Sequence, residues 1–189
     1  MTERSERTRA RLQNAALELF LEHGYDETTV AQIAAAVGVS QMTFFRHFPT
    51  KESVVLDDPY DPLIAAAVLA QRSDLPAFER VRRGLREAWR RLPEPAEEQT
   101  RDKIRLAVRH PALRAATFEN NHRTEAIIVE ALESAGVPRM DAVVAAGACL
   151  GAIMGALVDW GTSGDDAPLG ERVLAALACL PHEGNDPDE

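Results

Sequence analysis

Cysteine is scarce in this sequence, with two residues in 189, and aromatic side chains make up only 5% of the chain. Cys149 and Cys179 lie in apolar surroundings, where we expect buried, reduced thiols, and two cysteines do not suffice for a disulfide framework or a four-ligand zinc site. The sequence also lacks a phosphate-binding glycine loop, an H-E-x-x-H motif and a G-x-S-x-G motif. These absences predict a protein that is not an enzyme and that uses no metal or cofactor.

One pair of candidate metal ligands remains, Glu119 and His122, whose spacing places both on one face of a helix. A di-iron bundle needs a second E-x-x-H motif and two further glutamates. No second E-x-x-H occurs in the chain. We therefore expect no metal site, so metal analysis of the purified protein should find no stoichiometric iron or zinc.

Signals for a membrane or for secretion are also weak. The first twelve residues carry charge at every second or third position and so lack the apolar core of a signal peptide. The stretch 142–158 contains no charge, and its length is at the lower limit for crossing a bilayer. Its apolarity comes mostly from Ala and Gly, and no Lys/Arg cluster follows it. We predict a buried helix, no membrane contact and a cytoplasmic protein.

Charge is distributed unevenly along the chain. Residues 1–51 hold six basic and six acidic residues, so the net charge of -9 comes from residues 52–189, which hold 15 basic and 24 acidic residues. No acidic residue occurs from Thr28 to Lys51, and three basic side chains end that segment: Arg46, His47 and Lys51. A polyanion such as nucleic acid can approach this segment, whereas the acidic remainder would repel it.

The first fifty residues have the pattern of three helices. Apolar residues recur at helical spacing in 12–20 and again in 30–37. Gly38 supplies a permissive turn, and Ser40 can cap a third helix over 41–47. Two short helices joined by a glycine-containing turn form a helix-turn-helix, whose second helix enters the DNA major groove.

The side chains of the third helix suit contact with DNA. Gln41 offers an amide pair to a base edge, and Met42 and the Thr43 methyl group can pack against a thymine methyl. The hydroxyls of Ser40 and Thr43 can hydrogen-bond a phosphate or a base, and the basic side chains at the end of the segment can reach flanking phosphates. Two weaker interpretations stay open: Met42 packs only within the protein, and Arg46 is a solvated side chain.

This segment resembles the N-terminal DNA-binding domain of the TetR (tetracycline repressor) family. The resemblance rests on residues 15–20, 23–25, 28–30, 33–34, 37–40, 43–48 and 51–52. It implies an all-helical homodimer that binds a palindromic operator and releases it when a small molecule fills a pocket in the C-terminal domain. Together with the spacing argument it gives this DNA-binding set: Thr28, Thr29, Ser40, Gln41, Met42, Thr43, Phe45, His47 and Lys51. Phe45 departs from the family, which usually has a tyrosine there with its hydroxyl on a phosphate.

Three other interpretations remain for the helix-turn-helix. It can be a small helical subdomain with a chance turn, it can dock a protein partner, or it can bind DNA without any effector. Docking of a protein gives no reason to exclude acidic residues from 28–51. A DNA-binding protein without an effector would not need a second, acidic helical domain. We therefore favour the ligand-responsive regulator, most plainly a repressor.

The remainder of the chain predicts further helices and no strands. We divide the whole chain into a helix-turn-helix domain over 1–50, a helical effector-binding and dimerisation domain over 51–181, and a disordered acidic tail over 182–189. Proline- and glycine-containing segments separate helices expected at about 96–109, 111–135, 139–162 and 168–180. The predicted fold class is therefore all-α.

An arginine-rich helix is expected between residues 78 and 92. Its apolar stripe is accompanied by six arginines on the other positions. These arginines could contact nucleic acid, but nearby glutamates balance them. We favour a solvated face.

A dimer interface is predicted on the last two helices. Gly147, Gly151 and Gly155 recur every four residues, which leaves one helix face without side chains for close contact. An apolar stripe on the last helix would complete a four-helix interface between two subunits; its residues are Leu169, Val173, Leu177 and Leu180. The alternative is a glycine repeat buried within one monomer.

The effector pocket has candidate residues on several helices. Large apolar groups can surround a cavity and a few polar groups can orient its ligand; the candidates are Trp89, Phe118, Met154 and Trp160, with Arg105, Asn121 and His122 as polar contacts. Core packing is the alternative for each apolar residue. The C-terminal part loosely resembles TetR regulators that answer to acyl-CoA-like or other lipophilic ligands, which implies an apolar or acyl-CoA-like effector.

Overall fold

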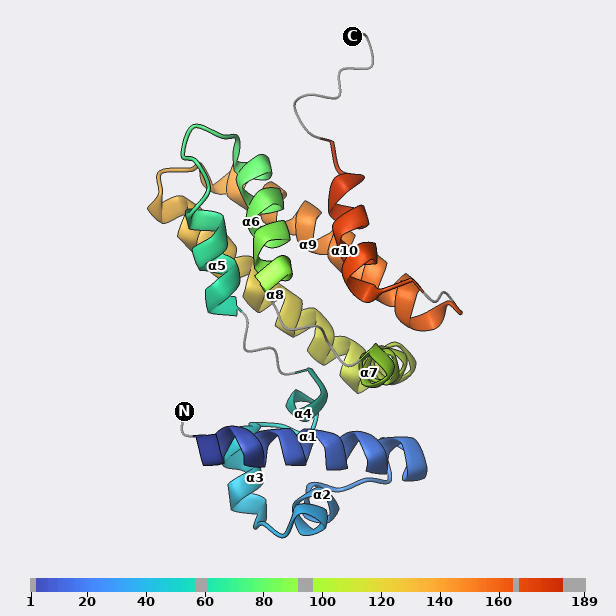
Figure 1. Ribbon diagram of the computed structural model, residues 1–189. Coiled ribbons are helices and arrows are strands. Elements are labelled where there is room, and N and C mark those ends of the chain that lie inside the picture. The colour runs from blue at the N-terminus through green and yellow to red at the C-terminus, as the bar shows by residue number, and fades with distance from the viewer. Residues whose placement is uncertain (1–2, 57–60, 92–96, 165–166, 182–189) are drawn as a thin grey trace. The chain divides into compact units, whose positions relative to one another are not determined.

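The computed structural model describes residues 3–56, 61–91, 97–164 and 167–181 (Figure 1). Within these ranges the chain forms ten α-helices and no strand, as the sequence predicts. The helices are α1 (Glu3–His23), α2 (Val30–Val37), α3 (Gln41–His47), α4 (Ser53–Leu56), α5 (Asp61–Leu69), α6 (Ala77–Arg91), α7 (Glu97–Arg109), α8 (Pro111–Ser134), α9 (Arg139–Thr162) and α10 (Leu169–Ala178). The predicted disordered tail, 182–189, lies outside the described residues.

Two compact units divide the chain, and they do not follow its order. Unit 1 is Met1–Asp57 with Asp102–Phe118, and unit 2 is Asp58–Arg101 with Glu119–Glu189. The sequence placed one boundary after residue 50 and assigned everything beyond it to the second domain. The segment 102–118 instead packs with the N-terminal helices, because Leu106 and Leu113 are buried in the same core. Helices α7 and α8 therefore each contribute residues to both units.

The core of unit 1 holds the helix-turn-helix together. The periodic apolar residues of α1 face those of α2, α3 and α4, and burial of such side chains is the main favourable term in folding. The largest fully buried groups are Leu12, Phe20, Tyr25, Ile33, Phe44, Phe48 and Leu113. Phe44 and Phe48, one turn apart, fix the orientation of α3 about its axis, with ring centroids 5.6 Å apart.

Unit 2 is a stack of helices in which α6 packs against α5 and α9, and α10 packs against α9 and α6. The helices α5 and α6 cross closely at Gly84, where an added Cβ would lie 2.6 Å from Val68 Cα. Trp160 of α9 is fully buried, and its Nε1 donates to the Ala167 carbonyl at 2.8 Å. The Arg101 guanidinium lies 3.8 Å from the Trp160 ring centroid and donates to the Trp160 carbonyl at 2.6 Å.

The helix α9 is less buried than the sequence predicts. It is long and apolar enough to cross a membrane by length and composition, and only 28% of its most apolar window is buried inside the chain. The prediction of a fully buried helix over 142–158 is therefore wrong. One face packs into unit 2 through Ala142, Ala146 and Cys149, and another leaves apolar groups such as Val144 exposed.

The two cysteines have different environments. Cys149 is buried in unit 2, and burial raises the pKa of its thiol to about 12. Cys179, at the C-terminal end of α10, is exposed, so the expectation of two buried thiols is correct only for Cys149. The expectation failed for Cys179 because the buried apolar stripe of α10 lies on the side of the helix opposite to it.

Candidate nucleic-acid interface

The turn between α2 and α3 has the local geometry that the sequence encodes. Thr29 and Gln32 form a complete capping box at the start of α2. Gly38 ends α2 with φ 74°, a left-handed conformation that favours glycine. Ser40 then caps α3, its hydroxyl accepting the Thr43 backbone N–H at 3.1 Å. These caps fix the backbone at the end of α2 and at the start of both helices.

Two arginines of α1 reinforce this geometry. Arg9 donates to the His47 carbonyl at the end of α3, at 3.0 Å, and its guanidinium lies 4.6 Å from the Phe48 ring centroid. Arg11 donates to the Val37 carbonyl at the end of α2, also at 3.0 Å. Cations at the C-terminal ends of helices also interact favourably with the helix dipole. The sequence showed both arginines only as charges. Arg11 adjoins the core residue Leu12 and Arg9 lies three positions before it, which was a usable signal.

The exposed face of α3 is apolar and amide-bearing, with little positive charge. Gln41 is exposed, Met42 is 81% exposed and Phe45 is 49% exposed. Arg46, in the last turn, is also exposed. Such large apolar groups are seldom left in water on a short helix without a partner. The exposure of Met42 makes packing only within the monomer untenable.

The hydroxyl groups near α3 are exposed but already take part in caps. Thr29 accepts from the Gln32 backbone N–H at 3.2 Å, and Ser40 Oγ lies 3.1 Å from Thr43 Oγ1. Each hydroxyl oxygen keeps a second lone pair and each lies at a helix N-terminus, where phosphate binds readily. Thr29, Ser40 and Thr43 thus remain candidates for phosphate contact.

Thr28 does not belong to the exposed face. Its side chain is 1% exposed, and its hydroxyl lies 2.8 Å from the Gly24 carbonyl and 3.2 Å from the Leu19 carbonyl as a shared donor. The prediction that Thr28 contacts DNA is therefore wrong, because its side chain is buried. Thr28 instead closes the end of α1 against the start of α2.

Lys51 also has an internal function. Its ammonium group donates to the carbonyls of Tyr25 at 2.9 Å and Thr28 at 3.1 Å, and it lies 4.0 Å from the Tyr25 ring centroid. The Tyr25 hydroxyl donates to Glu52 at 2.6 Å. Lys51 therefore fastens the residues before α4 to the turn after α1. It is not the freely extended phosphate contact that the sequence predicted, although one donor of its three remains.

His47 is half-buried at the end of α3. Burial, followed by the charges of Arg46 and Arg9, lowers the pKa of its imidazole below the usual value. These causes disfavour the charged imidazole in the protein without DNA. Of the three basic residues that end the acid-free segment, Arg46 is the exposed cation.

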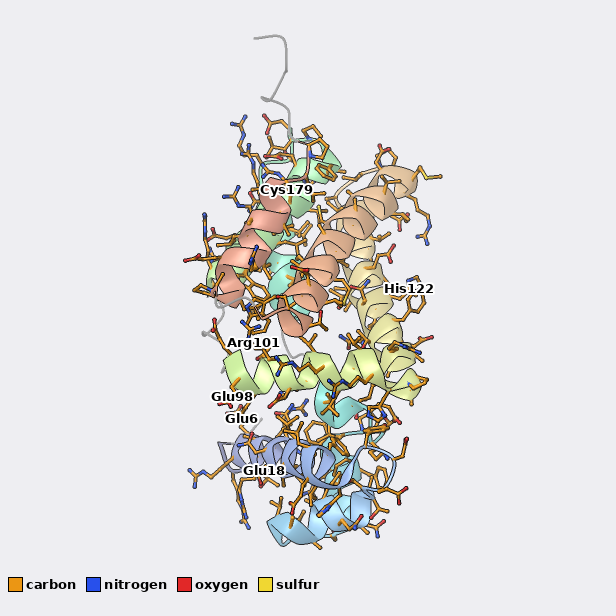
Figure 2. All side chains as sticks on the ribbon, turned by 90° about the vertical axis from the view of Figure 1, so that its right-hand side faces the viewer. Glu6, Glu18, Glu98, Arg101, His122 and Cys179 are labelled. Atoms are coloured by element: carbon orange, nitrogen blue, oxygen red, sulfur yellow. The ribbon has the colours of Figure 1, made fainter. Side chains whose placement is uncertain are left out.

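The predicted effector residues are divided between the two units. Arg105 and Phe118 belong to unit 1, and Phe118 is 70% exposed. In unit 2 Trp160 is a core residue, and His122 projects from α8 with its Nδ1 3.3 Å from Glu125 Oε2 (Figure 2). The remaining candidates are partly buried side chains of unit 2: Trp89, Asn121 and Met154.

Part of the predicted dimer interface is core. Leu169, Val173 and Leu177 are at most 1% exposed within the single chain, because α10 packs this stripe against α9 and α6. Their assignment to a dimer interface is therefore wrong, and Leu180 is half-buried. Gly151 and Gly155 are exposed, with nothing within 4 Å of an added Cβ. Gly147 is half-buried beside Glu125, whose Oε1 would lie 3.6 Å from such an atom.

The E-x-x-H pair, Glu119 and His122, lies on α8. The His122 Nδ1 lies 3.3 Å from Glu125 Oε2. No group of three or more potential metal-ligating side chains occurs among the residues that the structure describes.

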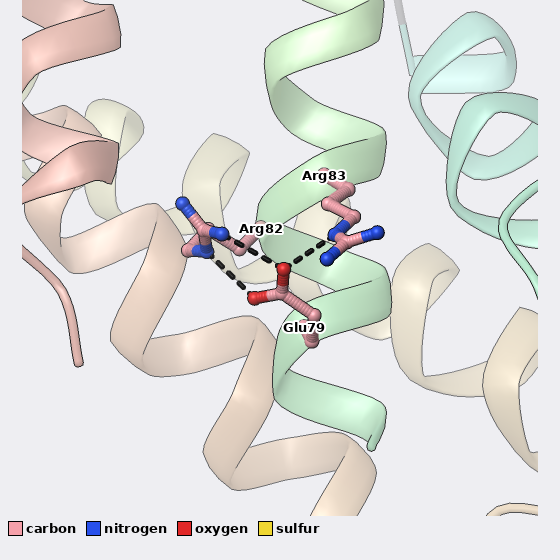
Figure 3. A network of polar contacts seen from close by, with 3 residues as sticks. All are labelled: Glu79, Arg82 and Arg83. Carbon is pink, nitrogen blue, oxygen red and sulfur yellow. Dashed lines mark hydrogen bonds and ion pairs between the residues drawn. The ribbon is translucent and has the colours of Figure 1, made fainter. Parts of the chain in front are cut away.

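The arginines of α6 differ most from expectation. Arg80 is 3% exposed and Arg82 is 5% exposed, so the prediction of a solvated face is wrong for both. Arg82 forms two hydrogen bonds of 2.8 Å with Glu79, and Arg83 contacts the same carboxylate (Figure 3). The hydrogen bond from Arg82 is the main reason that the pKa of Glu79 falls to about 2.

Comparison with protein families gives two matches that together cover most of the chain. Residues 12–57 match the family described as bacterial regulatory proteins, tetR family. Residues 75–183, more than half of the chain, match the MftR C-terminal domain.

A curated relative is similar over the helix-turn-helix region. The chain is 62% identical over 50 residues to the HTH-type transcriptional regulator TcmR of Streptomyces glaucescens. This match covers 26% of the chain and 22% of the length of TcmR. It therefore concerns the DNA-binding part and leaves the rest of that relative unmatched.

Solved structures with the same fold cover nearly the whole chain. SmeT in complex with triclosan, from Stenotrophomonas maltophilia, has a TM-score of 0.59 at 20% identity and covers 94% of this chain and 93% of its own. NalD of Pseudomonas aeruginosa, a secondary repressor of the MexAB-OprM multidrug efflux pump, has a TM-score of 0.56 at 22% identity, with coverage of 94% and 96%. At these identities the likeness concerns the fold.

Proposed function

Because the chain belongs to the tetR family of bacterial regulatory proteins, we propose that it represses transcription from a palindromic operator and leaves it when a small effector binds. Membership of this family makes it a DNA-binding transcriptional regulator. The repressing action, the palindrome and the effector are the proposed part. No catalytic step is included in the proposal.

The exposed face of α3 is the observation that carries the proposal. Capping residues and two arginines of α1 hold α3 rigid, and the face left in solvent presents Gln41, Met42 and Phe45. No acidic residue lies within 28–51 to repel phosphate. An amide beside apolar groups suits an adenine next to a thymine methyl.

A homodimer supplies the second recognition helix. Two copies of α3 must lie about 34 Å apart to enter successive major grooves on one side of the duplex. We assign the interface to the exposed stripe of α9, where Val144, Gly151 and Gly155 leave an apolar surface without bulky side chains. A second copy covers that stripe through the same residues, as a two-fold interface requires.

The helices α7 and α8 provide continuity between effector and DNA-binding parts. Each contributes residues to both units, and in unit 1 the corner between them packs on the core through Leu106, Leu113 and His110. The His110 and Tyr25 ring centroids lie 5.3 Å apart. A change in the direction of either helix, produced by an effector in unit 2, then alters the support of the helix-turn-helix.

The effector is proposed to be a small apolar or acyl-CoA-like molecule bound by unit 2. The fold relative SmeT is seen with triclosan, a small apolar compound. To loosen DNA binding by 5- to 150-fold, the effector must prefer one state of the protein by about 1 to 3 kcal/mol. Tight binding that does not distinguish the two states would change nothing.

Fluorescence anisotropy with labelled duplexes tests the proposal. The purified protein is titrated against the DNA upstream of its own gene and against a scrambled duplex at about 0.15 M salt, because affinity for DNA depends on salt. We expect a preference of about 10³-fold or more for the true operator. If the upstream DNA shows none, selection of bound fragments from the whole genome follows. Absence of any preferred sequence there would favour a protein partner.

A further inference from the structure

Two arginines of α6 each place one nitrogen, the Nε, inside unit 2 without a hydrogen-bond acceptor. The Nε atoms of Arg80 and Arg86 are both buried, and neither makes a hydrogen bond. Arg80 is the more enclosed residue, at 3% exposure, whereas Arg86 is half-buried. Arg80 also lies in the first turn of α6, where the helix dipole adds positive potential.

The charges buried around α6 do not balance. Among the described residues, the buried charged side chains are Glu79, Arg80 and Arg82. The Glu79 carboxylate is already engaged by Arg82 and Arg83. Cys149 supplies no counter-charge, because burial raises the pKa of its thiol and keeps it protonated. The buried Nε of Arg80 therefore has no hydrogen-bond acceptor, and no further buried carboxylate among the described residues balances its charge.

An arginine cannot relieve this cost by losing its proton, because its pKa is too high. Burial of an unpaired charge is strongly unfavourable, and buried charges in proteins are normally paired. A surface arginine could instead extend its head into water, as long charged side chains often do. Arg80 does not, since almost none of the residue is accessible.

We propose that the effector of this regulator carries an anionic group, a carboxylate or a phosphate, that binds the guanidinium of Arg80 within unit 2. Arginine suits this function because its planar fork pairs with the oxygens of both groups. The effector is then an amphiphile whose anionic end is fixed at the start of α6. This inference rests on the proposed function, in that it names the chemistry of the proposed effector.

Three probes with the same alkyl chain separate the contribution of the anionic group from that of the apolar chain: decanoate, decyl phosphate and 1-decanol. Binding is followed by tryptophan fluorescence, since both tryptophans of the chain, Trp89 and Trp160, lie in unit 2. We expect at least one anionic probe to bind about tenfold or more tightly than 1-decanol, the range of a hydrogen bond to a charged group. The two anionic probes also distinguish a carboxylate from a phosphate effector.

The variant Arg80→Met should bind all three probes with the affinity that the wild type has for 1-decanol. Arg80→Lys should keep part of the anion preference, and Arg90→Met should leave it unchanged. Arg90 is a matched control because it is an exposed arginine on the same helix. Without ligand, Arg80→Met should melt no lower than the wild type, because an unpaired buried charge is removed.

Equal binding of decanoate, decyl phosphate and 1-decanol by the wild type would overturn the inference. So would binding of none of them, or an anion preference that survives in Arg80→Met. If Arg80→Met fails to fold, an Arg80→Lys variant without any change in preference contradicts the inference as well. Operator binding without ligand is measured separately, so failure of the anion site is distinguishable from failure of the proposed regulator.

Discussion

On the exposed face of α3, the proposed function assigns the choice of DNA sequence to single residues. Gln41 begins the helix with its amide in solvent, and Met42, at 81% exposure, has no protein surface to cover it. An amide can exchange two hydrogen bonds with adenine, whereas a thioether only gains from contact with an apolar group such as a thymine methyl. Gln41 should therefore determine which base is preferred, and Met42 should add mainly to affinity.

Replacement of Gln41 by alanine should relax base preference. We expect a loss of about 1 to 3 kcal/mol on the preferred operator and little change on scrambled DNA. Competition binding with operators changed at one base pair at a time measures this, because the variant should stop discriminating at one position of each half-site.

The control is Arg46→Gln, on the same helix. Loss of a phosphate contact should weaken binding to all DNA sequences alike and reduce the slope of log affinity against log salt concentration by about 1. If both variants lose affinity with unchanged selectivity, the division between base and phosphate contacts is wrong.

Phe45→Tyr should strengthen DNA binding. Phe45 is 49% exposed and its ring meets Phe44 edge-on, so a hydroxyl added at its outer end would meet solvent or phosphate and not the core. One additional hydrogen bond to phosphate is worth about 1 kcal/mol, or roughly fivefold in affinity. Anisotropy titrations of both proteins check the gain, and unchanged thermal stability shows that the ring position is retained. Weaker binding would place Phe45 against an apolar part of the DNA.

At the scale of the helix, α6 is an amphipathic element whose polar side is partly internal. Glu79 lies in its first turn and holds Arg82 at i+3 and Arg83 at i+4. Such pairs on an exposed helix contribute little. Here Glu79 and Arg82 are buried, so removal of one partner leaves a charge without compensation.

Glu79→Gln should lower the stability of the protein at neutral pH by about 3 kcal/mol. The folded-state pKa of Glu79 is about 2, below the ordinary 4.5. Its stabilising contribution is therefore present above pH 4.5 and is lost as the pH falls towards 2. The difference in unfolding free energy between wild type and variant should shrink across this window, which urea denaturation at several pH values measures.

Glu87→Gln is the matched control. Glu87 forms an ion pair with Arg91 at 2.8 Å on an exposed part of the same helix. Its loss should change stability by less than about 1 kcal/mol at any pH. A constant difference between wild type and Glu79→Gln from pH 7 to 3 would show that Glu79 acts through packing and not through its charge.

At the scale of the whole molecule, the proposed function requires a second copy of the chain. The exposed stripe of α9 is the described surface best suited to it, because Gly151 and Gly155 let another helix approach closely. Gly151→Arg should leave the monomer folded, since nothing lies within 4 Å of an added Cβ. We expect monomers in light scattering and loss of tight operator binding, because one recognition helix reaches only one half-site.

Ala126→Arg provides the comparison for this variant. Ala126 is exposed on α8, so it receives the same charge and bulk away from the proposed interface. This variant should stay dimeric and bind the operator as the wild type does. A dimer that survives Gly151→Arg and dissociates in Ala126→Arg would move the interface from α9 to α8.

The all-α class and the helix-turn-helix were predictable because local interactions decide them. Proline- and glycine-containing segments placed α7 to α10 to within a few residues, and the turn at Gly38 and the cap at Ser40 form as expected. Caps and turns involve residues three or four positions apart, so a sequence displays them directly. The exposed residues of α3 follow from the same periodicity, once Phe44 and Phe48 are assigned to the core.

Which polar side chains point inward was decided by tertiary structure. Thr28 and Lys51 are residue types that often contact DNA, but here both donate hydrogen bonds to backbone carbonyls between α1 and α2. The stripe of α10 that was assigned to a partner is covered by α9 and α6 of the same chain. Periodicity identifies an apolar face without identifying what covers it.

The sequence by itself therefore determined α1 to α3, α6 to α10 and the character of the exposed face of α3, since these depend on neighbours along the chain. The boundaries of the short helices α4 and α5 were not predicted. Only the tertiary structure placed residues 102–118 with the helix-turn-helix and enclosed Arg80 and Arg82. Both depend on contacts between helices far apart in sequence. The burial of a charged side chain in particular is set by what surrounds it, and nothing in the pattern of α6 distinguishes its inward arginines from its solvated ones.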